Sequence, residues 1–274
     1  MSARVLDTLL PQLRHEPARK RVRATLGDEV VVDSTDAVLV WEPQRVIPAY
    51  AVPREHLRGE LLPAPAAAAP AGPLGFRIPS GQTVLDPSVP FSVHSADGEP
   101  LSVRAAGQTR EGAAFRPADP DLGGHVVLDF AGFDAWFEED EPIVAHPRDP
   151  FHRLDVLPSS RRVRVGLDGV VLAESTRARL LFEGPILPVR AYLPREDIRV
   201  PLRPSLTRTR CPQKGEAAYW SVDLDGYIIH DLAWSYEDPL REVAPLAGLV
   251  CFFNERVDVT LDGRSEARPH TPWS

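Results

Sequence analysis

The chain has 274 residues, 29 of them proline, and a formal net charge of −8. This length predicts two domains of about 120–140 residues, and the proline content favours short strands and loops over long helices. The acidic balance argues against a nucleic-acid partner, because surfaces that bind nucleic acid concentrate positive charge.

The sequence also predicts no membrane partner. No run approaches the roughly 20 apolar residues of a membrane span, and residues 1–10 lack the apolar core and cleavage site of a signal peptide. Cys211 and Cys251 are the only cysteines, too few for a disulfide framework or a four-thiolate zinc site. We therefore expect a cytoplasmic protein.

The first predicted element is a short helix near Val5–Leu13, and the chain after it repeats itself. An ungapped match recurs 141 residues later. It pairs Arg21–Arg23 with Arg162–Arg164, Ser34–Thr35 with Ser175–Thr176, Glu42 with Glu183, and Pro53–Glu55 with Pro194–Glu196. Chance does not explain these identities, so the sequence predicts two tandem copies, at 1–150 and 151–274.

The two copies are predicted to differ in their middles. A weaker match pairs Phe133–Glu139 with Leu249–Glu255 at the smaller offset of 116 residues, which implies about 25 extra residues in the first copy. The Ala/Pro-rich tract near 61–73 is the predicted insertion. The first copy also has no Cys-Pro-x-Lys-Gly motif between Leu57 and Phe133, so we interpret it as degenerate.

The segment His146–Ser160 is rich in Pro, Asp and Arg and is the predicted domain boundary. His146, Asp149 and His152 within it could present two imidazoles and a carboxylate to a metal ion. Nothing places them on a regular element, which favours a polar linker.

The second copy is predicted to consist mainly of hairpins. Arg162–Leu167 and Val170–Ala173 flank Asp168–Gly169, which suits a tight hairpin turn. Further elements are strands at Glu216–Leu224 and Tyr227–Trp234 joined by Asp225–Gly226, a short helix near Pro194–Ile198, and a final strand pair, Leu249–Phe253 and Arg256–Leu261, closed by Asp262–Gly263. Strand alternation places Trp220, Val222 and Leu224 on one face of their strand.

The sharpest local motif is Cys211-Pro-Gln-Lys-Gly215. Lys214 could hold a carboxylate or phosphate, or, if buried, act as a base or form a Schiff base. The alternative is a lysine paired with Glu183 or Glu216 that pins the loop onto the sheet. Cys211 lies among basic residues that favour the thiolate, although a packed, inert thiol is the competing interpretation.

The stretch Thr209–Trp220, followed by Ala233–Pro239, resembles the signature of the "domain of unknown function 427" family. Val165–Glu183 and Tyr192–Asp197 are similar to it as well, so the resemblance covers nearly the whole second copy. It implies a β-tent fold, two small antiparallel sheets meeting at an angle. Relatives with that fold often hold zinc through two Cys-x-x-Cys pairs, which this chain lacks, so we predict no structural zinc. A nucleotidyltransferase label is sometimes attached to the family.

These observations predict a mainly β protein with few short helices and one site, in the second copy. The catalytic candidates are Lys214, Cys211 and Glu216, and the candidate ligand-binding residues are Glu183, Arg190, Tyr192, Tyr219, Trp220, Trp234 and Tyr236. Arg190 and Tyr192 align with alanines of the first copy, which favours a site role for both.

We expect a small anionic or aromatic ligand, with Lys214 and Arg190 on its anionic group and Trp220, Trp234 and Tyr236 around its apolar body. No phosphate-binding or dinucleotide-binding glycine motif is present, and no cofactor or metal is predicted. The alternatives are a non-catalytic scaffold, in which the two copies pack as an intramolecular pseudo-dimer in a monomeric chain, and nucleotidyl transfer, for which no set of metal-binding carboxylates can be assembled from the sequence.

Overall fold

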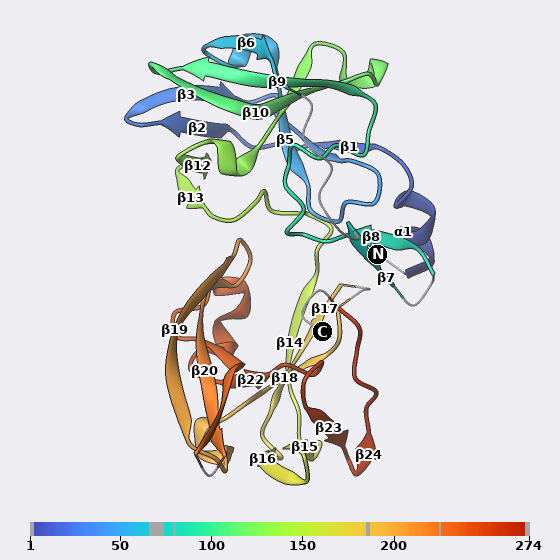
Figure 1. Ribbon diagram of the computed structural model, residues 1–274, viewed down its shortest axis with the longest axis vertical. Helices are drawn as coiled ribbons and strands as arrows, with labels where there is room; N and C mark the ends of the chain where they lie inside the picture. Colours follow the sequence, from blue (N-terminus) through green and yellow to red (C-terminus); the bar gives the residue numbers. More distant parts are fainter. Residues whose placement is uncertain (1–2, 66–73, 79–80, 185–186, 225, 272–274) are drawn as a thin grey trace. The chain divides into compact units, whose positions relative to one another are not determined.

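The computed structural model describes residues 3–65, 74–78, 81–184, 187–224 and 226–271. The chain divides into two compact units, Ser2–Asp149 and Pro150–Ser274, which we call the first and second unit (Figure 1). Antiparallel strands make up most of each unit and the helices are short, which confirms the predicted mainly β class. None of the helices in the described ranges is long and apolar enough to cross a membrane.

The first unit builds one sheet of seven strands, in the order β1-β4-β5-β11-β10-β9-β6, and one of four strands, in the order β13-β12-β2-β3. A small hairpin of β7 and β8 stands apart from both. The elements are α1 (Ala3–Leu9), β1 (Arg14–Pro17), β2 (Val22–Leu26), β3 (Glu29–Ser34), β4 (Val38–Trp41), β5 (Ala49–Pro53), the 3-10 helix η1 (Arg54–His56), β6 (Glu60–Pro63), β7 (Gly75–Arg77), β8 (Thr83–Leu85), β9 (Gly98–Ala105), β10 (Gln108–Pro117), η2 (Pro120–Leu122), β11 (His125–Leu128), η3 (Phe130–Gly132), β12 (Ala135–Glu138) and β13 (Glu141–Ile143).

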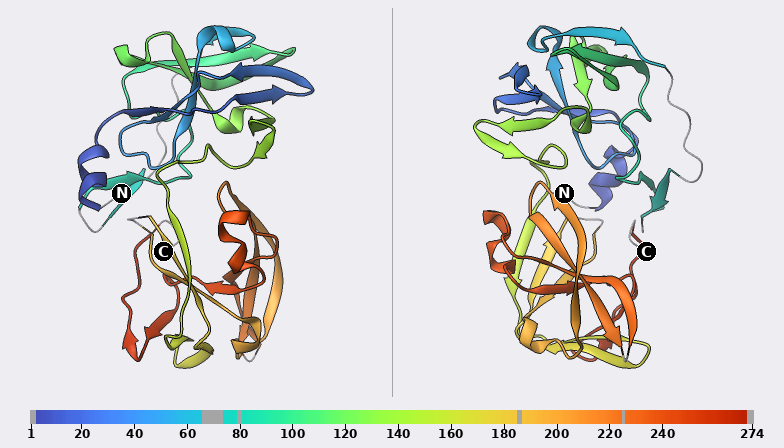
Figure 2. Two further views of the ribbon diagram at one scale, coloured as in Figure 1. Left: turned by 180° about the vertical axis from the view of Figure 1, so that it is seen from behind. Right: turned by 60° about the vertical axis from the view of Figure 1, so that its left-hand side comes forward.

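The second unit builds a seven-stranded sheet, β14-β17-β18-β22-β21-β20-β19, and a four-stranded sheet, β16-β15-β23-β24. The long strands β19, β20 and β21 form a meander, drawn in orange in Figure 2. The elements are β14 (Leu154–Pro158), β15 (Val163–Leu167), β16 (Val170–Ser175), β17 (Arg179–Glu183), β18 (Arg190–Leu193), η4 (Arg195–Asp197), β19 (Leu202–Cys211), β20 (Gly215–Leu224), β21 (Tyr227–Tyr236), η5 (Arg241–Leu246), β22 (Val250–Phe252), β23 (Asp258–Leu261) and β24 (Arg264–Ser265).

The two units share one strand order. Replacing β1, β4, β5, β11, β10, β9 and β6 by β14, β17, β18, β22, β21, β20 and β19 converts the first seven-stranded sheet into the second, and the four-stranded sheets correspond in the same way. We call residues at the same sheet position counterparts. Duplication would produce such a correspondence, although a common origin of the units stays a prediction.

The weaker sequence match does not follow these counterparts. Trp136 pairs with Ala24, and Val259 pairs with Val165, the residue 141 positions after Ala24. Trp136 therefore has Val259 as its counterpart rather than Phe252, and the offset of 116 was wrong. The extra chain of the first unit lies between β6 and β9, where the second unit has only the short β19–β20 loop. Of the predicted insertion near 61–73, residues 61–63 belong to β6, and residues 66–73 lie outside the described residues.

Local turn chemistry explains the elements that were predicted correctly. The hairpin of β15 and β16 turns at Asp168 and Gly169, whose φ angles are 49° and 83°, and aspartate and glycine tolerate this region best. Strands β20 and β21 agree with the predicted pair; the turn residue 225 lies outside the described residues. The predicted helices correspond to α1 and to the shorter η4, while η5 was not predicted.

The predicted final strand pair was wrong. Strand β22 pairs with β18 and β21 in the seven-stranded sheet, whereas β23 pairs with β15 in the other sheet. The Asp262–Gly263 turn instead joins β23 to β24. Adjacent strands in the sequence were assumed to pair, but the short segment after β22 carries the chain from one sheet to the next.

Each seven-stranded sheet carries a buried apolar cluster on both of its faces, while its edge strand β19 in the second unit is largely exposed. In the second unit the inner face packs on the four-stranded sheet through residues that include Leu193, Val222 and Phe252. The outer face carries a separate apolar cluster, covered in part by Val243 and Leu246 of η5. Most of the predicted site residues belong to this outer face.

Candidate functional site

The loop that carries the Cys-Pro-Gln-Lys-Gly motif is a tight hairpin between β19 and β20. Cys211 pairs with Gly215, which leaves three residues in the loop. Proline pre-sets the backbone at the start of such a turn, and Gly215 has a φ of 96°, which favours glycine at the end of it. The Leu240 amide donates to the Lys214 carbonyl at 3.1 Å and ties the loop to the segment before η5. The motif thus has a local structural explanation, except for its lysine side chain.

The Lys214 ammonium forms an ion pair with Glu183 at the end of β17. Only 12% of the lysine side chain and 8% of the glutamate side chain are exposed. In the sheet order, β18, β22 and β21 separate β17 from β20, so the contact requires a coiled sheet whose outer face curves inward. The ion pair therefore spans the outer face.

His152 is the third member of this group, and its Nε2 lies 3.0 Å from Glu183 Oε1. Burial would raise the pKa of Glu183, but Lys214 and His152 outweigh it and lower that pKa to about 2. The carboxylate therefore stays ionised throughout the physiological pH range. His152 lies in the segment predicted as a polar linker, and no sequence signal connects it with Glu183.

The ionisation of Glu183 predicts a pH dependence. A carboxyl whose pKa is lowered on folding stabilises the fold fully above its ordinary value of 4.5, and this contribution is lost as the pH falls towards about 2. We expect a loss of about 3 kcal/mol in the second unit across this interval. Denaturant unfolding from pH 6 to pH 2 would measure it against Glu183→Gln, which cannot titrate; identical acid profiles would contradict the expectation.

The two lysines of the chain are used in the same way. Lys20 in the first unit pairs with Glu138 at 2.6 Å, and that carboxylate is also buried. Glu138 accepts a second hydrogen bond from the Tyr50 hydroxyl at 2.7 Å. Each lysine thus faces a buried carboxylate, whereas a pair such as Arg210–Glu216 is exposed.

Aromatic residues lie on the outer face beside the ion pair. Trp234 donates through Nε1 to the Tyr192 hydroxyl at 3.1 Å, and the two rings meet edge to face. Tyr236, on the same strand as Trp234, is 5% exposed. Burial, with Cys211 and Glu183 nearby, raises the pKa of Tyr236, so its hydroxyl remains a proton donor. Within the described part of the chain, this hydroxyl has no hydrogen-bond partner.

Arg190 forms an ion pair with another buried carboxylate, that of Glu255. Its two terminal nitrogens donate to both oxygens of Glu255 at 2.8 and 2.7 Å, and its guanidinium lies over the Trp234 ring. The Thr271 hydroxyl donates to Glu255 at 2.6 Å, which docks the C-terminal segment here. Such a bidentate pair fills the geometry through which arginine would clamp an anionic ligand.

The structure does not bring all the predicted site residues together. Trp220 packs on the inner face, with its Nε1 donating to Ser235 at 2.8 Å. It therefore lies on the side of the sheet opposite Trp234 and Tyr236, and the three cannot enclose one ligand. Glu216 is exposed and accepts a hydrogen bond from Arg210 at 3.0 Å. Cys211 is partly exposed at the base of the hairpin loop.

Phe253 and Cys251, which were not among the predicted site residues, also lie on the outer face. Tyr219, a predicted site residue, stacks on Phe253 with ring centroids 6.3 Å apart, and Phe253 also touches Trp234. The Tyr219 hydroxyl lies 3.0 Å from the Thr209 hydroxyl. Burial raises the pKa of the Cys251 thiol to about 12, so this cysteine is held as a neutral thiol in the apolar cluster.

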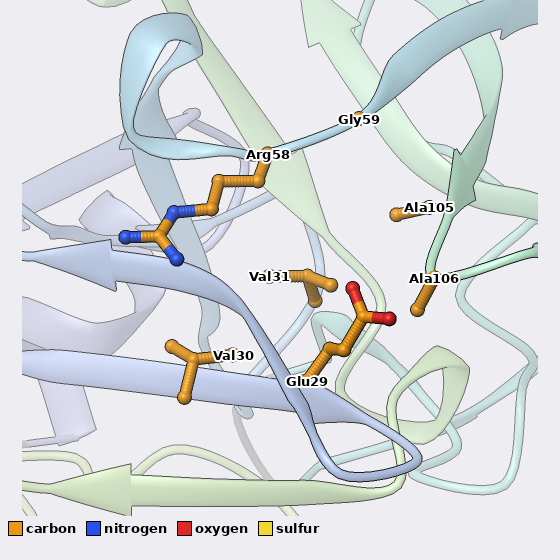
Figure 3. A pocket seen from close by; sticks show the side chains of 7 residues that line it. All are labelled: Glu29, Val30, Val31, Arg58, Gly59, Ala105 and Ala106. Carbon is orange, nitrogen blue, oxygen red and sulfur yellow. The ribbon is translucent and has the colours of Figure 1, made fainter.

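An open hollow in the first unit is lined by none of the predicted site residues. It lies between the start of β3 and the end of β9 (Figure 3) and is lined by Glu29, Val30, Val31, Arg58, Gly59, Ala105 and Ala106. Over the described ranges, no cluster of three or more His, Cys, Asp or Glu residues is placed to hold a metal ion. His146 contacts the Pro147 carbonyl, whereas His152 contacts Glu183.

Comparison with known families identifies part of the chain. Residues 155–263 match the model of the domain of unknown function 427, a family labelled NTP_transf_9. The match falls within the second unit and contains Glu183, the hairpin loop and the outer-face aromatics. No curated protein matches the chain.

Proposed function

We propose that the second unit, which is similar to the domain of unknown function 427 over residues 155–263, binds a small molecule on the outer face of its seven-stranded sheet. The ligand places an anionic group between the Lys214 ammonium and the Tyr236 hydroxyl. The apolar part of the ligand contacts Tyr219 and Phe253.

The Tyr236 hydroxyl carries this proposal. The Tyr236 side chain is only 5% exposed, but its hydroxyl oxygen reaches solvent and has no hydrogen-bond partner among the described residues. A hydroxyl at the surface end of a buried ring is open to water or to a ligand. Glu183 and Cys211 lie close enough to influence its ionisation. A donor in this position, next to an ammonium with three hydrogens, suits a carboxylate or phosphate oxygen.

The charges of the group favour binding over catalysis. The Lys214 nitrogen donates to the Glu183 carboxylate, so the structure places it as a hydrogen-bond donor in an ion pair rather than as a base or nucleophile. Lys214 and Glu183 together are neutral, so the pair presents no excess negative charge to an anionic ligand.

A conservative substitution tests the proposal. Tyr236→Phe removes the hydroxyl without loss of ring volume and is expected to weaken binding of a small anion at least about tenfold, because hydrogen bonds to charged groups contribute about 1.5–3 kcal/mol. The probes are benzoate, acetate and inorganic phosphate, titrated against the full chain and followed through the amide chemical shifts of Cys211 and of residues 213–216.

Tyr227→Phe is the matched control, since Tyr227 starts the same strand and is 72% exposed. If none of the three probes shifts these amides, or if both tyrosine variants bind like the wild type, the proposal fails.

A specific observation favours a second candidate, a scaffold without ligand: Lys214 and Arg190 each already hold a buried glutamate. A pseudo-dimer of the two units and nucleotidyl transfer stay predictions.

A further inference from the structure

In the first unit, the carboxylate that corresponds to Glu183 has different partners. Glu42 follows β4 as Glu183 ends β17, and the two stand 141 residues apart. Among the described residues, no lysine pairs with Glu42. Its partners come instead from residues 89–96, which precede β9 within the extra chain of this unit and which we call the strap.

Glu42 binds one end of the strap. Its Oε2 accepts the amides of Ser95 and Ala96 at 2.7 and 3.1 Å, and its Oε1 lies 2.9 Å from His94 Nδ1. The carboxylate side chain is 5% exposed. These partners take up both carboxylate oxygens of Glu42, whereas Lys214 and His152 both contact Oε1 of Glu183 in the second unit.

Arg45 binds the other end of the strap. Its guanidinium donates to the carbonyls of Val89 at 3.3 Å, Pro90 at 3.0 Å and Val93. A glutamate and an arginine three residues apart thus bind the amides and the carbonyls of one segment. Because the Glu42 carboxylate binds amides at one end and the Arg45 guanidinium binds carbonyls at the other, these contacts set the direction in which the strap runs.

The strap covers the outer face of the first sheet. His94 stacks on Phe115 with ring centroids 3.8 Å apart, and Phe91 meets His94 edge to face. Phe115 pairs with Val127, which pairs with Ala51, just as Trp234 pairs with Cys251, which pairs with Tyr192. Phe115 is therefore the counterpart of Trp234.

We propose that the strap is an internal occupant that closes the first unit's counterpart of the candidate site. It supplies hydrogen-bond donors to the buried carboxylate and a flat ring to the aromatic position, so that no outside molecule reaches either. The inference does not depend on ligand binding by the second unit. If that binding occurs, the chain holds one ligand.

Hydrogen exchange on the full chain tests the closure. Glu42→Gln keeps the side-chain size but removes the charge that binds the two amides. We expect the protection of the Ser95 and Ala96 amides at pH 7 to fall at least about tenfold, since a charged acceptor makes the stronger hydrogen bond. Amides of β2 and β12, in the core of the same unit, should keep their protection, which identifies local opening.

Glu183→Gln makes the same change in the second unit and should leave the strap unaffected. Unchanged protection of Ser95 and Ala96 in a folded Glu42→Gln variant would overturn the proposal. If that variant does not fold, Arg45→Met provides the test, because it removes the guanidinium that donates to the strap carbonyls and leaves the Glu42 carboxylate in place. It should raise exchange at Val89 and Val93 while β2 and β12 stay protected; uniform loss of protection across the unit would instead make these residues general core contacts.

Discussion

Replacing Lys214 by methionine is expected to destabilise the second unit by about 3–5 kcal/mol, because removal of one partner leaves a buried carboxylate uncompensated. His152 remains in contact with Glu183, which places the loss toward the lower end of this range. Denaturant-dependent hydrogen exchange on peptides of β17 and β21 measures the change in the full chain.

The double variant Lys214→Met with Glu183→Leu separates the ion pair from the packing. It should recover most of the lost stability, since exchanging both members of a buried pair for apolar residues is often neutral. Lys20→Met is the matched control: Lys20 is 43% exposed, and Glu138 keeps the Tyr50 hydroxyl, so a loss of about 1 kcal/mol or less is expected in the first unit.

The opposite outcome is equally informative. If Lys214→Met leaves the stability of the second unit unchanged, the ion pair does not hold the outer face together. A simultaneous loss of benzoate or phosphate binding would then assign the lysine to the ligand alone, and the scaffold alternative would fail.

The second large effect is expected at Arg190. Arg190→Met leaves Glu255, whose side chain has no exposed surface, without its bidentate partner, and should cost about 3–5 kcal/mol. Arg190→Lys should fall between this variant and the wild type, because a single ammonium cannot reproduce two parallel hydrogen bonds and the stacking on Trp234.

Arg190 also connects to the C-terminal segment through Glu255 and Thr271. Exchange of the Thr271 amide should therefore rise in Arg190→Met along with that of β18. Arg210→Met serves as the control, since its pair with Glu216 is exposed and should contribute about 0–1 kcal/mol. Equal stabilities of the two methionine variants would contradict a structural role for Arg190.

Part of the candidate site was accessible from the sequence. The lysine, the glutamate and two outer-face aromatics of the second unit were named from motif and strand parity, and Trp234 and Tyr236 do share a face. Trp220 was wrongly grouped with them. Parity orders residues within one strand, but the register between strands sets Tyr219, and not Trp220, opposite Trp234.

Contacts across the sheet could not be predicted. Glu183 meets Lys214 over three intervening strands, and His152 reaches the same carboxylate from a segment that looked like a linker. In the first unit, the insertion was predicted near 61–73, which does not include the strap, and nothing in the sequence indicated that residues 94–96 would bind Glu42.

The turns and strand faces followed from the amino-acid sequence, because Asp168–Gly169 and Pro212–Gly215 act on backbone angles within a few residues. The partners of Glu183, Arg190 and Glu42 came from the folded sheets. Burial makes an unpaired charge costly, and which cation or amide meets each carboxylate depends on sheet coiling and register, properties that join residues distant in the chain.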